Sequence, residues 1–95
     1  MQEDIYRQYL QNDYGIISEK AIKSRISRIR SIERKCMLNV DKVICDDKMM
    51  YHALVFISTC GLLRPDNYSN ALRKYYKYFN KKEFPSIKVY EENYL

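Results

Sequence analysis

Apolar positions recur every three or four residues along most of the chain, which is the spacing of amphipathic α-helices. The pattern predicts four helices, at about residues 2–13, 18–36, 47–60 and 67–80. Ser18 is a suitable N-cap for the second helix, and Gly15 and Gly61 are suitable stops for the first and the third.

Two further segments lie outside these helices. Residues 37–45 are too apolar for a free linker, so we expect them to pack as a turn or a short helix. Residues 84–90 alternate weakly between apolar and polar side chains, which suits a strand or an extended arm. We therefore expect an all-α fold: a compact four-helix bundle at residues 1–83, followed by a short extended C-terminal tail at residues 84–95.

The apolar faces predict how the helices pack. The third helix is apolar nearly all round, so we expect it to be central and most buried, with Phe56 facing Ile26 of the second helix. On the fourth helix the inward residues are expected to be Tyr68, Leu72, Tyr75, Tyr76 and Phe79. Tyr78 turns away from that arc, which makes it the better candidate for stacking on an unpaired base.

Composition narrows the class of protein. A chain of 95 residues with 46% apolar and 31% charged residues is expected to form one ordered domain. Its three cysteines include no CxxC pair, which excludes a disulfide framework and favours a reducing compartment. No apolar run approaches the roughly 18 residues of a membrane span, and the acidic N-terminus is unlike a signal peptide. We expect a cytoplasmic protein with no membrane partner.

The positive charge is concentrated in the second helix. Seven basic and two acidic residues lie between positions 18 and 36, so this stretch carries +5, the net charge of the whole chain. Arg, Lys and Ser are the side chains that commonly contact phosphates. The candidate nucleic-acid-binding residues are Lys20, Lys23, Ser24, Ser27, Arg28, Arg30, Ser31 and Arg34 on the second helix, with Arg73, Lys74 and Lys77 on the fourth. The alternative is a solvated or a protein-binding face.

Catalytic and metal-binding constellations are missing from the sequence. Cys36, Cys45, Cys60 and His52 are the soft or imidazole ligands, and their spacing predicts no metal site. We expect the cysteines to be free buried thiols and His52 to be a core or boundary residue. Two glycines cannot build a phosphate-binding loop, so neither an enzyme nor a cofactor is expected.

Three short stretches resemble the core-binding domain of phage integrases (tyrosine recombinases). Residues 18–22, SEKAI, resemble the S-x-x-T-[IV] start of that domain's basic helix, with Ala21 where the family usually has Thr. Residues 67–79, NYSNALRKYYKYF, resemble its last helix, and residues 39–44 stand where the family has an acidic-apolar link. The resemblance covers about residues 3–80.

The resemblance implies a SAM-like four-helix bundle that straddles duplex DNA with its second and fourth helices. Matched by position, the DNA-facing residues would be Lys20, Lys23, Ser24, Ser27 and Arg28, with Arg73 and Lys77. The family's catalytic domain is absent, so recombination is not expected. The leading hypothesis is a non-catalytic module that binds duplex DNA. The alternative is a small phage or mobile-element protein that binds and inhibits a host protein, of the anti-restriction or anti-CRISPR type.

Overall fold

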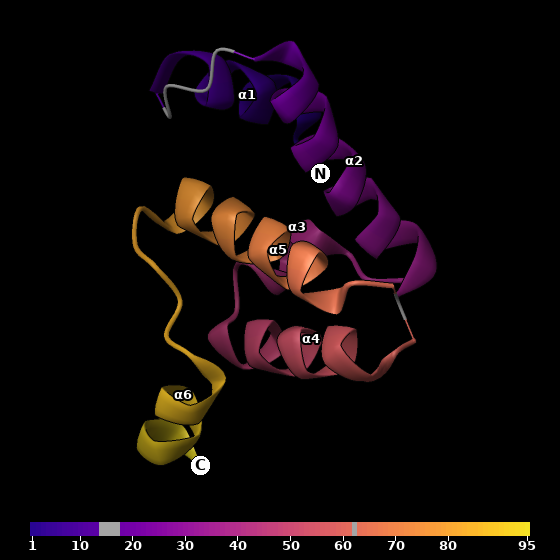
Figure 1. The fold of residues 1–95 in the computed structure, drawn as a ribbon. Coiled ribbons are helices and arrows are strands. Elements are labelled where there is room, and N and C mark those ends of the chain that lie inside the picture. The colour runs from indigo at the N-terminus through magenta and orange to yellow at the C-terminus, as the bar shows by residue number, and fades with distance from the viewer. Residues whose placement is uncertain (14–17, 62) are drawn as a thin grey trace.

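The computed structural model describes residues 1–13, 18–61 and 63–95, and these residues form an all-helical fold (Figure 1). The helices are α1 (Glu3–Gln8), which continues as a π-helical turn (Tyr9–Asp13), then α2 (Glu19–Lys35), α3 (Val40–Val43), α4 (Asp47–Thr59), α5 (Pro65–Asn80) and α6 (Ile87–Tyr94). The all-α prediction is confirmed, and of the two alternatives expected for residues 37–45, a turn or a short helix, the structure has the short helix α3. The predicted stop at Gly15 lies outside the described residues.

Local chemistry fixes where α2 begins and where α4 begins and ends. The Ser18 side chain accepts a hydrogen bond from the Ala21 backbone N–H at 3.3 Å, which caps α2. At the start of α4, Oδ1 of Asp46 accepts from the backbone N–H groups of Lys48 and Met49. Gly61 follows α4 with a φ of +82°, the left-handed conformation that ends helices and favours glycine.

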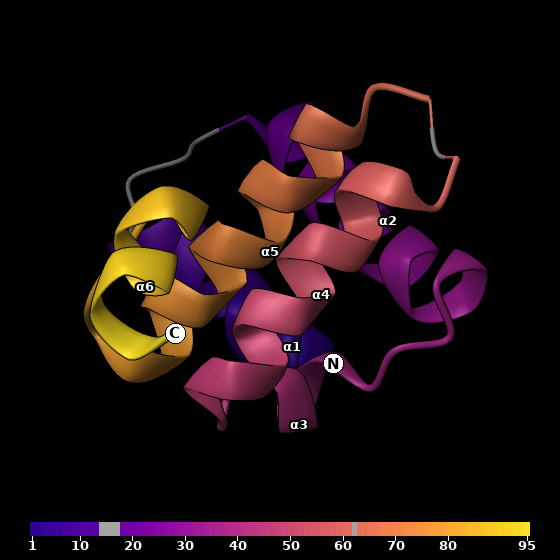
Figure 2. The ribbon, with the colours of Figure 1, turned by 90° about the horizontal axis from the view of Figure 1, so that it is seen from below.

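Helix α5 lies in the middle of the molecule. In Figure 1, α1 and α2 lie on one side of α5, and α4 and α6 lie on the other. Figure 2 shows α4 and α5 side by side, with α6 packed at one end of the pair. The largest fully buried side chains come from α1, α2, α4, α5 and the segments between them: Tyr6, Leu10, Ile22, Ile29, Ile32, Ile44, Met50, Leu54, Ile57, Leu72, Tyr75 and Tyr76.

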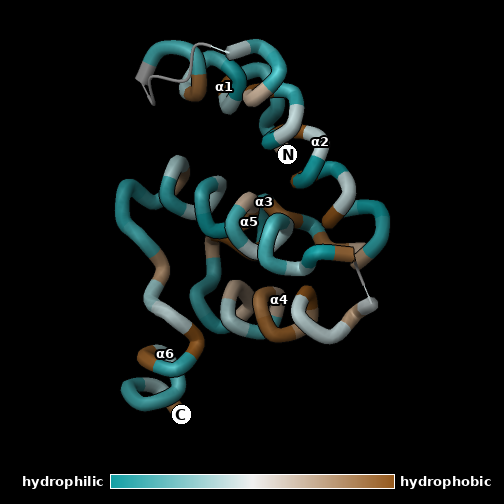
Figure 3. Tube along the Cα trace, viewed as in Figure 1, coloured by the Kyte–Doolittle hydropathy of each residue, from teal (hydrophilic) through white to brown (hydrophobic). Residues whose placement is uncertain are grey.

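The expectation that the third predicted helix would be the central one is wrong, because α5 lies in the middle and α4 is exposed along one side. Figure 3 shows that α4 carries much of the chain's hydrophobic sequence, yet Met49 is 42% exposed and Phe56 is 46% exposed. Phe56 therefore does not face Ile26 in the core, and His52 is exposed rather than in the core or at its boundary. The reason is geometric, since α3, α5 and α6 cover only part of the helix surface.

The prediction of an extended C-terminal tail is also wrong. Residues 87–94 form α6, which Ser86 caps by accepting a hydrogen bond from the Val89 backbone N–H at 3.2 Å. Phe84 and Tyr90 are buried, and the Tyr90 ring stacks on that of Tyr51 with centroids 4.8 Å apart. Tyr51 also donates a hydrogen bond to Oε2 of Glu91 at 2.6 Å. Helix α6 is therefore packed against α4.

Tyr78 lies in the core and is not available for stacking on a base. It is 8% exposed, and its ring lies 5.0 Å from that of Tyr6 and 4.9 Å from that of Tyr9. Phe79, which was expected to point inward, is 44% exposed. The buried face of α5 is thus wider than predicted, because it packs against elements on two sides.

Within the described residues, no helix is both long enough and apolar enough to cross a membrane.

Candidate nucleic-acid interface

The outer face of α2 carries the candidate phosphate-binding side chains. The inner face is formed by the buried residues Ile22, Ile26, Ile29 and Ile32. On the outer side the exposed candidates are Lys20, Lys23, Ser27, Arg28, Arg30 and Arg34, while Ser24 and Ser31 are half-buried. Because the isoleucines recur at helical spacing and are all buried, the cations and hydroxyls between them lie toward the solvent side of α2.

Both acidic residues of α2 pair with cations of the N-terminal segment. Oε1 of Glu19 accepts a hydrogen bond from Nη1 of Arg7 at 2.7 Å. Oε2 of Glu33 accepts one from the amino group of Met1 at 3.0 Å, and this amino group also pairs with Asp41. Burial lowers the pKa of the amino group, but its hydrogen bonds to Asp41 and Glu33 outweigh burial and raise that pKa above its ordinary value.

Most of the cations on α2 are therefore left without a carboxylate. Among the described residues, Arg30 forms an ion pair with Glu3. The cations of α2 that have no ion-pair partner in residues 1–13, 18–61 and 63–95 are Lys20, Lys23, Arg28, Arg34 and Lys35. Unpaired, exposed cations on one face produce a local positive potential that attracts an anionic partner.

An open depression of about 610 Å³ lies along the N-terminal half of this face, where it is lined by Glu19, Lys20, Lys23, Ser24, Ser27 and Arg28. Ammonium, guanidinium and hydroxyl groups thus surround one shallow space, together with the Glu19 carboxylate that pairs with Arg7. This donor set suits phosphate oxygens, because Arg and Lys supply charge while Ser hydroxyls fix the register of the contact.

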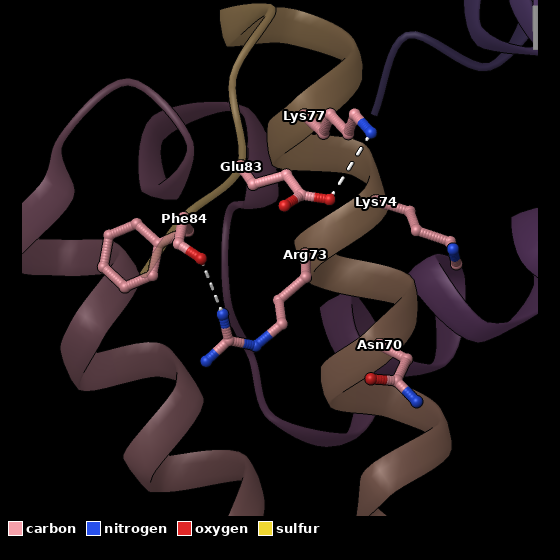
Figure 4. Close-up of a pocket in the computed structure, with 6 residues that line it drawn as sticks. All are labelled: Asn70, Arg73, Lys74, Lys77, Glu83 and Phe84. Atoms are coloured by element: carbon pink, nitrogen blue, oxygen red, sulfur yellow. Dashed lines mark hydrogen bonds and ion pairs between the residues drawn. The ribbon is translucent and has the colours of Figure 1, made fainter. Parts of the chain in front are cut away.

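On the basic side of α5, unlike on the outer face of α2, the cations Arg73 and Lys77 contact the segment that follows the helix (Figure 4). A pocket of about 410 Å³ is lined by Asn70, Arg73, Lys74, Lys77, Glu83 and Phe84. Nζ of Lys77 lies 3.4 Å from Oε1 of Glu83. Lys74 is half-buried, and Figure 4 shows its side chain directed away from Arg73 and Phe84.

Arg73, a predicted phosphate contact, holds the segment that follows α5. Its Nη1 donates hydrogen bonds to the backbone carbonyls of Phe84 and Pro85, both at 3.0 Å. Its guanidinium carbon lies 5.8 Å from the centre of the Phe84 ring, and burial lowers the pKa of Arg73. The Arg73 guanidinium therefore uses two of its N–H donors within the fold. It is half-buried and does not lie on an exposed face with those donors free.

Helices α2 and α5 pack against each other, so the two helices that carry the candidate residues are neighbours. Sequence reasoning missed Arg7, which lines a second depression with Lys23, Arg30 and Arg34. Arg7 lies on α1, so a survey of charge along α2 could not find it.

In the described part of the chain, no group of three His, Cys, Asp or Glu residues could hold a metal ion.

No family model, curated protein or solved structure matches this chain. The resemblance to the core-binding domain of phage integrases, with its SAM-like bundle, therefore stays a prediction from short motifs. The fold and the exposed basic face of α2 stand on the geometry given above.

Proposed function

We propose that this chain is a non-catalytic module that binds the phosphate backbone of duplex DNA through the outer face of α2. The observation that carries the proposal is the set of exposed, unpaired cations on that face, above all Lys20, Lys23, Arg28 and Arg34. The pairing of Glu19 and Glu33 with the N-terminal segment supports it, because these carboxylates do not neutralise the face.

The length of α2 suits several phosphate contacts. Its 17 residues extend for about 25 Å at 1.5 Å per residue. One DNA strand rises about 3.4 Å per nucleotide, so a helix of this length lies along roughly seven base pairs. Cations from Lys20 to Arg34 would then meet several phosphates in turn, while the hydroxyl of Ser27 would help to fix the register.

Helix α5 would contribute at the edge of the interface. Lys74 and Lys77 lie on a helix that packs against α2, and Lys77 is exposed. The contact of Lys77 with Glu83 is between two exposed groups and is therefore weak enough to be exchanged for a phosphate. Arg73 is excluded from the proposed interface because it holds the Phe84 and Pro85 carbonyls.

A salt titration tests the proposal. Binding of the purified chain to a fluorescent duplex of about 20 base pairs is followed by anisotropy over a series of salt concentrations. About four to six phosphate contacts predict that log K falls with log salt at a slope of roughly −4 to −5, since each contact contributes about −0.9. Binding that does not change with salt, or no binding to duplex at low salt, would exclude the proposal.

The second candidate function is binding of a protein partner, as an adaptor or inhibitor. It is supported by the exposure of Met49 and Phe56, which lie seven residues apart on one side of α4. Substituting both by Ser distinguishes the two candidates. DNA binding mediated by α2 would be unchanged in this variant, whereas a protein that docks on α4 would lose affinity.

A further inference from the structure

Two cysteine thiols that are distant in the sequence are in contact. The Sγ atoms of Cys36 and Cys60 lie 3.5 Å apart, although the two residues are separated by 24 positions. Each cysteine closes a helix, since Cys36 is the C-cap of α2 and Cys60 is the C-cap of α4. The third cysteine, Cys45, is exposed and lies between α3 and α4.

The surroundings leave room for the two sulfur atoms to come closer. A disulfide bond is about 2.05 Å long, so the sulfurs would have to approach by about 1.5 Å. The residues that follow the two cysteines, Met37 and Gly61, both have positive φ. Met37 is 88% exposed, and a side-chain carbon placed on Gly61 would meet no atom within 4 Å. The backbone beyond each cysteine can therefore shift without displacing core side chains.

We propose that Cys36 and Cys60 form a reversible intramolecular disulfide, with a small-molecule disulfide such as oxidised glutathione as the oxidant. The proposal does not depend on DNA binding. It assigns no metal to the pair, because the described residues supply no third ligand. It also separates Cys45 from the other two cysteines, which sequence reasoning had treated alike.

The accessibility of the two thiols sets the order of the steps. Cys36 is 6% exposed, and burial, followed by its hydrogen bond with Cys60, raises its pKa to about 11. Cys60 is only half-buried, so its thiol is the one that meets the oxidant. Once it has lost its proton to solvent, the Cys60 thiolate attacks one sulfur of the glutathione disulfide. That S–S bond breaks, and the glutathione thiolate that leaves takes up a proton.

The second step occurs within the protein. Cys36 loses its proton to solvent and attacks Sγ of Cys60, which breaks the mixed disulfide and releases a second glutathione, protonated on leaving. Two protein thiols are oxidised, and one glutathione disulfide is reduced to two thiols. The new bond joins the C-terminal ends of α2 and α4. Closing a loop of this size is expected to raise the melting temperature by about 10 °C or more.

Thiol mapping of the native protein tests the proposal. The fully reduced chain is incubated at pH 8 with a mixture of oxidised and reduced glutathione, alkylated and mapped by mass spectrometry without reduction. We expect a monomer with a Cys36–Cys60 bond, an alkylated Cys45 and a higher melting temperature, all reversed by dithiothreitol. Cys45→Ser is the matched control and should behave like the wild type. Cys36→Ser should stop at the mixed disulfide of Cys60 with glutathione.

Three results would overturn the proposal. The first is that Cys36 and Cys60 both remain alkylated across the whole range of glutathione ratios. The second is that only disulfides involving Cys45 form, whether between chains or with glutathione. The third is a Cys36–Cys60 bond that lowers the melting temperature, which would show that the native fold does not accommodate the bond. Thiol mapping and thermal melts of the wild-type protein distinguish these three results from the expected one, even if Cys36→Ser does not fold.

Discussion

The hydroxyl group of Tyr75 donates a hydrogen bond to Oδ1 of Asp41 at 2.7 Å and accepts one from the backbone N–H of Gln2 at 2.9 Å. Tyr75 is fully buried, and its ring meets that of Tyr6 edge-on at 4.8 Å between centroids. A single side chain of α5 therefore connects the N-terminal segment with α3.

Tyr75→Phe should destabilise the fold without disturbing its ring packing. The substitution removes both hydrogen bonds and leaves the Gln2 N–H and the Asp41 carboxylate short of a partner, which typically costs about 1–3 kcal/mol. Urea unfolding followed by circular dichroism measures the loss. Tyr94→Phe is the control, since Tyr94 is 70% exposed. Equal stability of the two variants would show that the Tyr75 hydroxyl contributes nothing.

The buried tyrosines should make the fold sensitive to alkali. Burial, with hydrogen bonds to Asp41 and Asp47 respectively, raises the pKa values of Tyr75 and Tyr76 above the ordinary 10.0. Below pH 10 both are protonated in the folded and unfolded chains, so their contribution to stability is fully present. Above pH 10 the unfolded chain loses protons that the folded chain retains, so stability should fall as the pH rises. Urea midpoints from pH 8 to 11 should show this fall, and the double variant Tyr75→Phe/Tyr76→Phe should show a shallower one.

The two sides of α2 should respond differently to truncation. Ile26 is 4% exposed, so Ile26→Ala removes core contacts and should lower the free energy of unfolding by about 2–5 kcal/mol. Arg30 is 60% exposed and makes no core contact on its outer side, so Arg30→Ala, which removes the pair with Glu3, should cost clearly less, about 1 kcal/mol. Thermal melts measure both variants. If Arg30→Ala were the more damaging change, the faces of α2 would be assigned the wrong way round.

Arg73→Ala should act on the fold rather than on DNA. It removes two hydrogen bonds from a charged donor to the carbonyls of Phe84 and Pro85, each typically worth about 1.5–3 kcal/mol before partial exposure reduces it. Chemical denaturation should show a clear loss of stability. Lys77→Ala, which removes only the exposed contact with Glu83, should be nearly neutral. A large loss of DNA affinity in a stably folded Arg73→Ala protein would contradict this assignment.

The position of the cations, and not their number, should decide DNA affinity. Lys23→Ala/Arg28→Ala removes two positive charges from the outer face of α2 and should flatten the salt slope by about 2. The matched control Lys48→Ala/Lys88→Ala removes the same charge from exposed positions on α4 and α6. Anisotropy titrations compare the pairs. Equal loss of affinity in both would indicate a general charge effect and not a site on α2.

Local sequence patterns correctly predicted most of the helices and which face of α2 is buried and which is exposed. The four isoleucines of α2 recur at helical spacing, and Ser18 and Gly61 are signals that act on the nearest turn of backbone. The extended tail was predicted because residues 84–90 alternate weakly between apolar and polar side chains, a pattern with a preference for strands. The Ser86 cap and the contact of Tyr90 with Tyr51 override that preference, and the second of these depends on a residue 39 positions away.

The candidate site was harder to predict because charge on a helix does not reveal its partners. Arg73 and Lys77 lie on the same side of α5 by sequence, yet Arg73 is bound to backbone carbonyls of a segment that was expected to be free. Likewise Arg30 is paired with Glu3 of α1, while Arg34, one turn further along, has no ion-pair partner in the described part of the chain. These differences arise from tertiary contacts, which the pattern of one helix does not contain.

The ring cluster of Tyr6, Tyr75 and Tyr78 also bears on the order in which the chain folds. Helices α3, α4 and α5 are consecutive, so their contacts close short loops, whereas Tyr6 must meet residues about seventy positions away. Closing the longer loop costs more entropy, and the contact is favourable only after α5 has formed. We therefore expect the pairing of α4 and α5 to come first and α1 to dock late. By the same reasoning we expect α1 to be among the first elements to detach when the native protein opens.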